Sequence, residues 1–186
     1  RDFVAGKTAW LTKYMALVPE KIKFQYVTGE IHHVFGRAYP LQVCLGMRDD
    51  AVVSTDGELQ LVLRTKQRER EKVFKAGMKR ILLWEIEKQL EIWTKRMAIP
   101  ESRITGVTIR VMKSRWGSCR RVTGRFSFAL DLVTKPKECI EAVVVHELCH
   151  LFAAGHGPDF YARMETYLPD YKERDRLLSS LPRELV

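Results

Sequence analysis

The sequence has no run of 18 apolar residues and no segment with the layout of a signal peptide. A membrane-spanning helix needs about 20 consecutive apolar residues, so we expect no membrane span, and the absence of a leader favours a cytoplasmic protein. Internal repeats and low-complexity segments are also absent, which excludes a repeat architecture. The chain begins at Arg1 rather than at methionine, which leaves open whether native residues precede it.

Cysteine is scarce: the chain has four, none in a CxxC pair, namely Cys44, Cys119, Cys139 and Cys149. Cys139 and Cys149 fall on one predicted helix at a separation of about 15 Å, which is far beyond disulfide reach. Reduced thiols in a cytoplasmic protein are therefore expected.

Acidic residues are outnumbered, since 32 Lys and Arg against 23 Asp and Glu give a formal net charge of +9. This excess favours an anionic partner such as a nucleotide, a nucleic acid or an acidic polypeptide. A basic surface that only maintains solubility is the alternative, and composition leaves both open.

With 186 residues, 46% of them hydrophobic, the chain can bury one substantial core. We predict a single domain over 1–186. Its parts are a strand-rich region over about 1–65, a long helix over about 68–98 and a catalytic part over about 106–186. Two lobes around a cleft remain an alternative, and the sequence does not specify an oligomeric state.

Hydrophobic spacing predicts an α+β fold. The helices are expected over 9–18, 68–97, 137–154, 158–168 and 171–181. The strands are expected within 24–44, and over 51–53, 59–63, 106–112 and 125–128. The strand over 106–112 should pair with that over 125–128 across a turn that holds Gly124, and the long helix should pack on an antiparallel or mixed sheet.

Histidine is also scarce, with five in the chain, yet two stand four residues apart in His146-Glu147-Leu148-Cys149-His150. On a helix, both imidazoles can reach one ion, which is half of a tetrahedral zinc site. Glu147 is expected close to the metal without ligating it, where it can take a proton from a bound water. This water is the expected nucleophile.

His156 is the predicted third ligand. We expect the helix to continue to Ala154 and to end at Gly155 in a left-handed conformation, which returns His156 toward the metal. The offset of ten residues from His146 matches the metzincin motif, but Ala153 stands at the metzincin glycine position and no Met-turn follows. A metzincin is therefore not expected. Zinc is the expected ion, with another divalent transition metal left open.

A helix whose histidines only bond to backbone carbonyls is the alternative. The segment over 142–145 reads Ala-Val-Val-Val, which indicates a buried helix. Burying two histidines and a glutamate there without a partner would cost several kcal/mol, so the metal-site interpretation is preferred. His32 and His33 face opposite sides of a strand; a structural role is expected for both, with support of the metal site by one of them as the alternative.

Three motifs together resemble the YgjP-like metallopeptidase-type family, relatives of SprT-like zincins. They are SRWGSC over 114–119, VVVHELCHLFAAGH over 143–156, and PDFY with PDY over 158–161 and 169–171. The segment GEIHHVFGRAYPLQV over 29–43 is similar to the family's entry into the sheet.

The resemblance implies a zincin-like fold with a long packing helix and an HExxH active-site helix. It also implies His146, His150 and His156 as metal ligands and Glu147 as the catalytic acid/base. Gly155 stands where the family usually has asparagine, which affects the pocket rather than the ligand set. A peptidase-like activity is implied, and a UTP pyrophosphatase activity has also been attributed to the family.

We therefore predict an enzyme, a zinc-dependent metallohydrolase acting on a peptide held by the strand that precedes SRWGSC. One alternative is a nucleoside triphosphate (UTP) pyrophosphatase in which Lys113, Arg115, Arg120 and Arg121 hold phosphates. Another is a nucleic-acid-binding module with a structural metal, in which Trp116 stacks on bases. Arg115 and Trp116 are the candidate substrate-binding residues. The simpler alternative is that Trp116 anchors the core and Arg115 is a salt-bridged surface residue.

Overall fold

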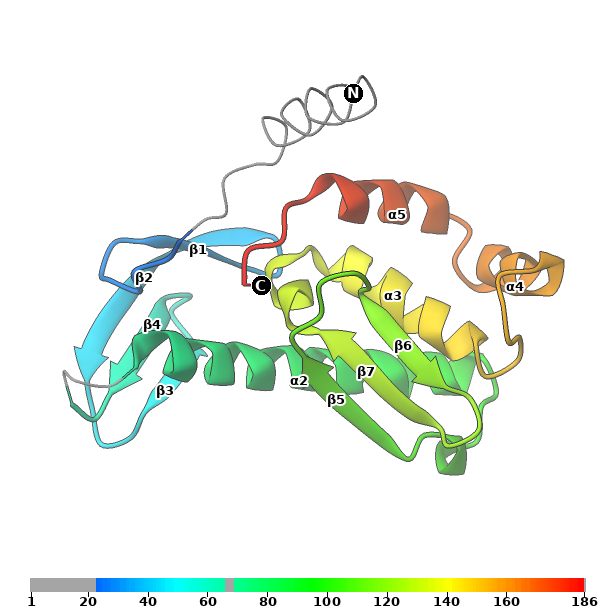
Figure 1. Ribbon diagram of the computed structural model, residues 1–186, viewed down its shortest axis with the longest axis horizontal. Helices are drawn as coiled ribbons and strands as arrows, with labels where there is room; N and C mark the ends of the chain where they lie inside the picture. The colour runs from blue at the N-terminus through cyan, green and yellow to red at the C-terminus, as the bar shows by residue number, and fades with distance from the viewer. Residues whose placement is uncertain (1–22, 66–68, 186) are drawn as a thin grey trace, which may run out of the picture.

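The computed structural model describes residues 23–65 and 69–185 (Figure 1). In this part the chain forms two small sheets and four α-helices, so the predicted α+β class is confirmed. The helix predicted over 9–18 lies outside the described residues. None of the helices that the structure describes combines the length and apolarity needed to cross a membrane.

The first sheet has the strand order β1-β2-β4-β3. Its strands are β1 (Ile31–Val34), β2 (Arg37–Leu45), β3 (Asp50–Val53) and β4 (Leu59–Leu63). β1 is antiparallel to β2, β3 is antiparallel to β4, and the central pair β2 and β4 is parallel. The strands predicted over 51–53 and 59–63 form a hairpin, whose turn holds Gly57 at a φ of 79° that a residue with a side chain rarely adopts.

The strand predicted at the start of 24–44 is wrong, because residues 23–27 form no strand. Their backbone is held by a side chain instead: the Glu30 carboxylate accepts hydrogen bonds from the N–H groups of Gln25 and Tyr26, both at 2.7 Å. Tyr26 has a φ of 54°, which is incompatible with a strand. A local side-chain acceptor thus replaces the expected sheet partner.

The predicted long helix is present as α2 (Arg70–Arg96), and it connects the two sheets. Figure 1 shows it running from the first sheet to the second, and it contacts β3, β4, β5 and α3. It buries one row of apolar side chains: Phe74, Met78, Leu82, Ile86, Leu90 and Trp93.

The second sheet has the order β5-β7-β6, with β5 (Gly106–Arg110), β6 (Gly117–Arg120) and β7 (Arg125–Ala129). The predicted pairing of β5 with β7 is present, but it is parallel rather than a hairpin. The turn at Gly124 joins β7 to β6, which is antiparallel to it. β6 comes from SRWGSC, whose mostly polar residues lack the apolar alternation that marks a strand, so spacing alone missed it.

The remaining helices are α3 (Lys137–Cys149), α4 (Pro158–Tyr167) and α5 (Tyr171–Ser180). The expectation that the active-site helix reaches Ala154 is wrong, because α3 ends at Cys149 and Gly155 has no positive φ. After Cys149 the chain tightens, since the Leu151 and Phe152 N–H groups donate to the carbonyl oxygens three residues earlier, each at 3.0 Å. This tight turn, rather than a left-handed glycine, redirects the chain.

A C-terminal segment over 181–185 closes the fold against the short 3-10 turn η2 (Leu130–Thr134). The buried Asp131 carboxylate accepts hydrogen bonds from the N–H groups of Glu184 at 2.8 Å and Leu185 at 2.6 Å. Glu184 in turn pairs with His33 at 3.0 Å and with the buried Lys135 at 3.5 Å. His33 therefore has a structural partner, as expected.

Neither His32 nor any of the four cysteines belongs to the group of predicted metal ligands. His32 is 1% exposed, stacks with Phe24, Tyr26 and Phe74, and bonds to Glu30 at 2.9 Å. The four cysteines are free thiols, and both Cys139 and Cys149 are buried as packing side chains.

Candidate active site

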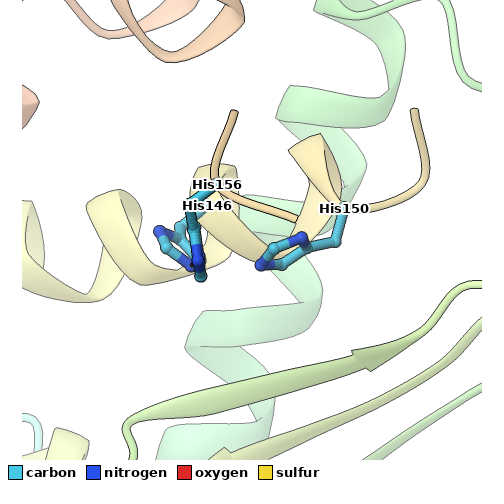
Figure 2. Close-up of side chains that lie close together, drawn as sticks. All are labelled: His146, His150 and His156. Atoms are coloured by element: carbon cyan, nitrogen blue, oxygen red, sulfur yellow. Dashed lines mark hydrogen bonds between the residues drawn. The ribbon is translucent and has the colours of Figure 1, made fainter. Parts of the chain in front are cut away.

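Three histidines from α3 and the loop after it converge on one point (Figure 2). His146 lies on the last turns of α3, His150 caps its end, and His156 returns from the loop that precedes α4. Their ring centroids lie 4.9 to 5.0 Å apart. One nitrogen from each ring lies within 4.8 Å of the others, and the Nε2 atoms of His146 and His156 are 3.1 Å apart.

This arrangement fits a tetrahedral metal ion with one position left open. A zinc–nitrogen distance of about 2.0–2.1 Å places two ligand nitrogens roughly 3.3 Å apart in a tetrahedral site. His150 directs its Nδ1 at the Ala153 carbonyl oxygen, 3.2 Å away, which leaves its Nε2 for a metal. In the described part of the chain, no cysteine or carboxylate joins the three histidines.

Two of the histidines, His146 and His150, are held in the form that binds a metal, since a ligating imidazole must be neutral. Burial lowers the pKa of His146 to about 4, and the neighbouring His150 and His156 add to the effect. Burial also lowers the pKa of His150. His146 and His150 therefore each have a nitrogen lone pair to offer at neutral pH.

Glu147 lies beside the cluster with a carboxylate that is almost fully enclosed. Its exposed fraction is 4%, and among the described residues its Oε2 has no hydrogen-bond partner. Burial raises its pKa to about 8, with the charge of Arg115 opposing the shift. A cation bound by the histidines would offset this cost of burying the carboxylate.

Gly117 in β6 makes the space that Glu147 occupies. A Cβ atom on Gly117 would lie 2.5 Å from Oε1 and 2.7 Å from Cγ of Glu147, closer than real Cβ contacts come. The backbone of β6 therefore forms the wall against which this carboxylate rests. Sequence reasoning did not single out Gly117, although a glycine inside a strand often marks a close approach.

Phe160 from α4 is a second residue that sequence reasoning did not assign to the site. Its ring is 1% exposed, and its centroid lies 4.9, 4.8 and 4.7 Å from those of His146, His150 and His156. The ring packs against all three imidazoles at once, so it fixes their mutual orientation. Its only sequence signal was its place on the apolar face of the helix and in the PDFY motif.

The three histidines line a pocket of about 600 Å³ between β6 and helices α3, α4 and α5. The two candidate substrate-binding residues, Arg115 and Trp116, both line it, as does Arg121. One face of Trp116 is covered by Arg183, whose guanidinium carbon lies 3.7 Å from the ring centroid. Arg183 also donates to the Met112 carbonyl oxygen at 2.8 Å, so it ties the SRWGSC loop to the C-terminal segment.

Three histidines that converge at the end of α3 beside a buried glutamate, in an α+β fold, define a metal-dependent hydrolase of the metallopeptidase type. The chain belongs to the YgjP-like family: the model of the YgjP-like metallopeptidase domain matches residues 1–181. The resemblance seen in the sequence is thereby confirmed.

Among solved structures, the chain is similar to two crystallised metallopeptidase zymogens. Abylysin of Pyrococcus abyssi is 24% identical with a TM-score of 0.46, and the match covers 54% of this chain and 99% of that one. Jannalysin of Methanocaldococcus jannaschii is 21% identical with a TM-score of 0.45, and the match covers 50% and 93%. Comparison with curated proteins finds no match.

Replacing Phe160 with alanine should loosen the histidine cluster. We expect Phe160→Ala to lower the free energy of unfolding by about 3–5 kcal/mol, as removal of a buried aromatic ring does, and to weaken zinc binding. Urea unfolding of the metal-free protein measures the first effect, and titration against a coloured chelator measures the second. Phe152→Ala is the matched control, because Phe152 is 40% exposed. Equal losses in the two variants would contradict this role for Phe160.

Proposed function

We propose that this protein is a zinc-dependent hydrolase of peptide bonds, with His146, His150 and His156 as the metal ligands. The observation that carries the proposal is the convergence of three imidazoles, one nitrogen from each within 4.8 Å of the others, beside a buried carboxylate. Three protein ligands leave the fourth tetrahedral position for water or substrate, which is typical of catalytic rather than structural zinc.

Glu147 is the proposed general base and acid. His146, His150 and His156 would hold a divalent metal, which would supply a Lewis acid for the scissile carbonyl and would lower the pKa of water. Glu147 takes the proton from the attacking water as the new C–O bond forms. It then gives the proton to the leaving nitrogen as the C–N bond breaks. Its Oε2 has no competing hydrogen bond within the described residues, and the β6 backbone at Gly117 fixes its position.

We place the substrate along β6. In the order β5-β7-β6 this strand is an edge, and among the described strands it pairs only with β7. Its free edge is next to the site, since Gly117, Ser118 and Cys119 all line the active-site pocket. An extended peptide can add to such an edge through main-chain hydrogen bonds. The sequence had suggested the strand before SRWGSC for this role, but that strand, β5, lies at the opposite edge.

Loss of one ligand should weaken metal binding sharply. We expect His156→Ala to reduce zinc affinity by about 100-fold or more, because two imidazoles cannot complete the site. The matched control is His33→Ala, which removes a histidine paired with Glu184 instead. Competition with a coloured chelator measures the affinities. Unchanged zinc binding in His156→Ala would remove this residue from the ligand set.

The zinc-loaded chain should cleave an unfolded protein such as denatured casein. A metal chelator should abolish the cleavage. Glu147→Gln should bind zinc as well as the wild type but cleave more slowly by a factor of about 10² or more, since loss of a general base has that effect. UTP is offered in parallel. Chelator-sensitive UTP hydrolysis without casein cleavage would instead support the pyrophosphatase alternative.

A methyl group on Gly117 should disturb catalysis without removing the metal. We expect Gly117→Ala to displace the Glu147 carboxylate and to slow peptide cleavage by roughly 10²-fold, as small misplacements of catalytic groups do. Gly106→Ala is the matched control, because no atom lies within 4 Å of its added Cβ. Casein cleavage and zinc affinity are measured for both variants. Full activity in Gly117→Ala would show that this contact does not position Glu147.

A further inference from the structure

The outer face of the second sheet carries a groove that the proposed mechanism does not use. Its volume is about 770 Å³, and it is lined by residues of β5, β6, β7 and the loop over 111–115. Phe126 and Phe128 point from β7 into the core, so the alternate residues Arg125 and Ser127 point outward into the groove. The groove therefore lies on the face of the sheet that faces away from the core.

The groove is strongly basic. It is lined by Arg110, Arg115, Arg120 and Arg125, all of them exposed, and by no acidic residue in the described part of the chain. Arg120 and Arg125 stand directly opposite each other on β6 and β7. Like charges at this position repel and destabilise the sheet. Neither arginine has an acidic partner among the described residues, so an external anion would relieve the repulsion.

The groove and the active-site pocket share β6 as a common wall. Arg115, Ser118 and Cys119 line both hollows. Side chains of an extended peptide alternate between the two faces of a sheet. A peptide paired with the edge of β6 would therefore send one set of side chains toward the pocket and the alternate set toward the arginines.

We propose that this groove binds acidic side chains of the polypeptide substrate, so that the enzyme prefers peptides with Asp or Glu at alternate positions near the cleaved bond. The inference rests on the proposed function, because it places the peptide along β6. Guanidinium groups pair with carboxylates through two parallel hydrogen bonds. The four arginines, which form no ion pair among the described residues, and a row of hydroxyls from Thr108, Ser118 and Ser127 match such side chains in charge and polarity.

The same features fit a single-stranded nucleic acid less well. Such ligands are held by stacking of bases on exposed aromatic rings as well as by positive charge. The one aromatic residue that lines the groove in the described chain is Phe126, which is 1% exposed. Trp116 nearby has one face covered by the Arg183 guanidinium at 3.7 Å. The groove thus offers charge without a stacking platform.

Peptide binding to the 186-residue chain tests the proposal without any turnover. The probes are a fluorescent peptide with Glu at alternate positions and the same peptide with Gln in place of Glu, added to zinc-loaded Glu147→Gln protein. We expect the Glu peptide to bind about tenfold more tightly by fluorescence anisotropy, and higher salt to reduce the difference. The double variant Arg110→Gln/Arg125→Gln should lose the preference. Arg37→Gln/Arg48→Gln, which removes the same charge from exposed positions in β2 and in the loop that follows it, should keep it.

Three results would overturn the proposal. The first is equal affinity for the two peptides, and the second is an equal loss of preference in both double variants. The third is tighter binding of a single-stranded oligonucleotide of the same net charge, lost in the groove variant, which would assign the groove to nucleic acid. Failure of the proposed function is distinguished by a separate result. If the wild-type protein binds the Glu peptide through the groove but cleaves no peptide, the proposed catalysis is wrong while the groove proposal stands.

Discussion

The contact between the Glu147 carboxylate and the backbone of Gly117 is the constraint on which the rest of the site depends. It brings α3 against β6 so closely that no side chain fits between them. Because Glu147 follows His146 directly, the same contact sets the position of the histidine cluster relative to the free edge of β6. An enclosed carboxylate is unfavourable unless a positive charge balances it. The proposed metal therefore has a role in stability as well as in chemistry.

Elements distant in sequence hold the two walls of the pocket. On one side, Phe160 of α4 packs against all three imidazoles, so α4 positions ligands that come from α3 and the following loop. On the other side, Arg183 stacks on Trp116 and donates to the Met112 carbonyl oxygen, while Asp131 accepts hydrogen bonds from the C-terminal segment. The loop that carries SRWGSC is thus tied to the core by the C-terminal segment.

The sequence predicted those features that depend on short-range periodicity. The convergence of His146 and His150 follows from helical spacing, and the long helix follows from its apolar row. Features set by contacts far apart in the sequence were missed. Gly117 and Arg183 acquire their roles from neighbours 30 and 67 residues away. The end of α3 at Cys149 depends on turn hydrogen bonds that no residue type predicts. Gly155 instead favoured a left-handed helix end at that residue, and this prediction is wrong.

The basic side chains of this chain differ in whether a nearby acidic residue neutralises them. Many basic side chains on the helices are already neutralised by ion pairs, such as Lys75 with Glu71, Lys95 with Glu91 and Arg174 with Glu141. The arginines of the second sheet have no such partner among the described residues, and two of them face each other across neighbouring strands. Pairing with β6 would give a substrate peptide its register at the site, and that register would decide which of its side chains meet these arginines. A single edge strand can thus set both the position of the cleaved bond and the charge preference beside it.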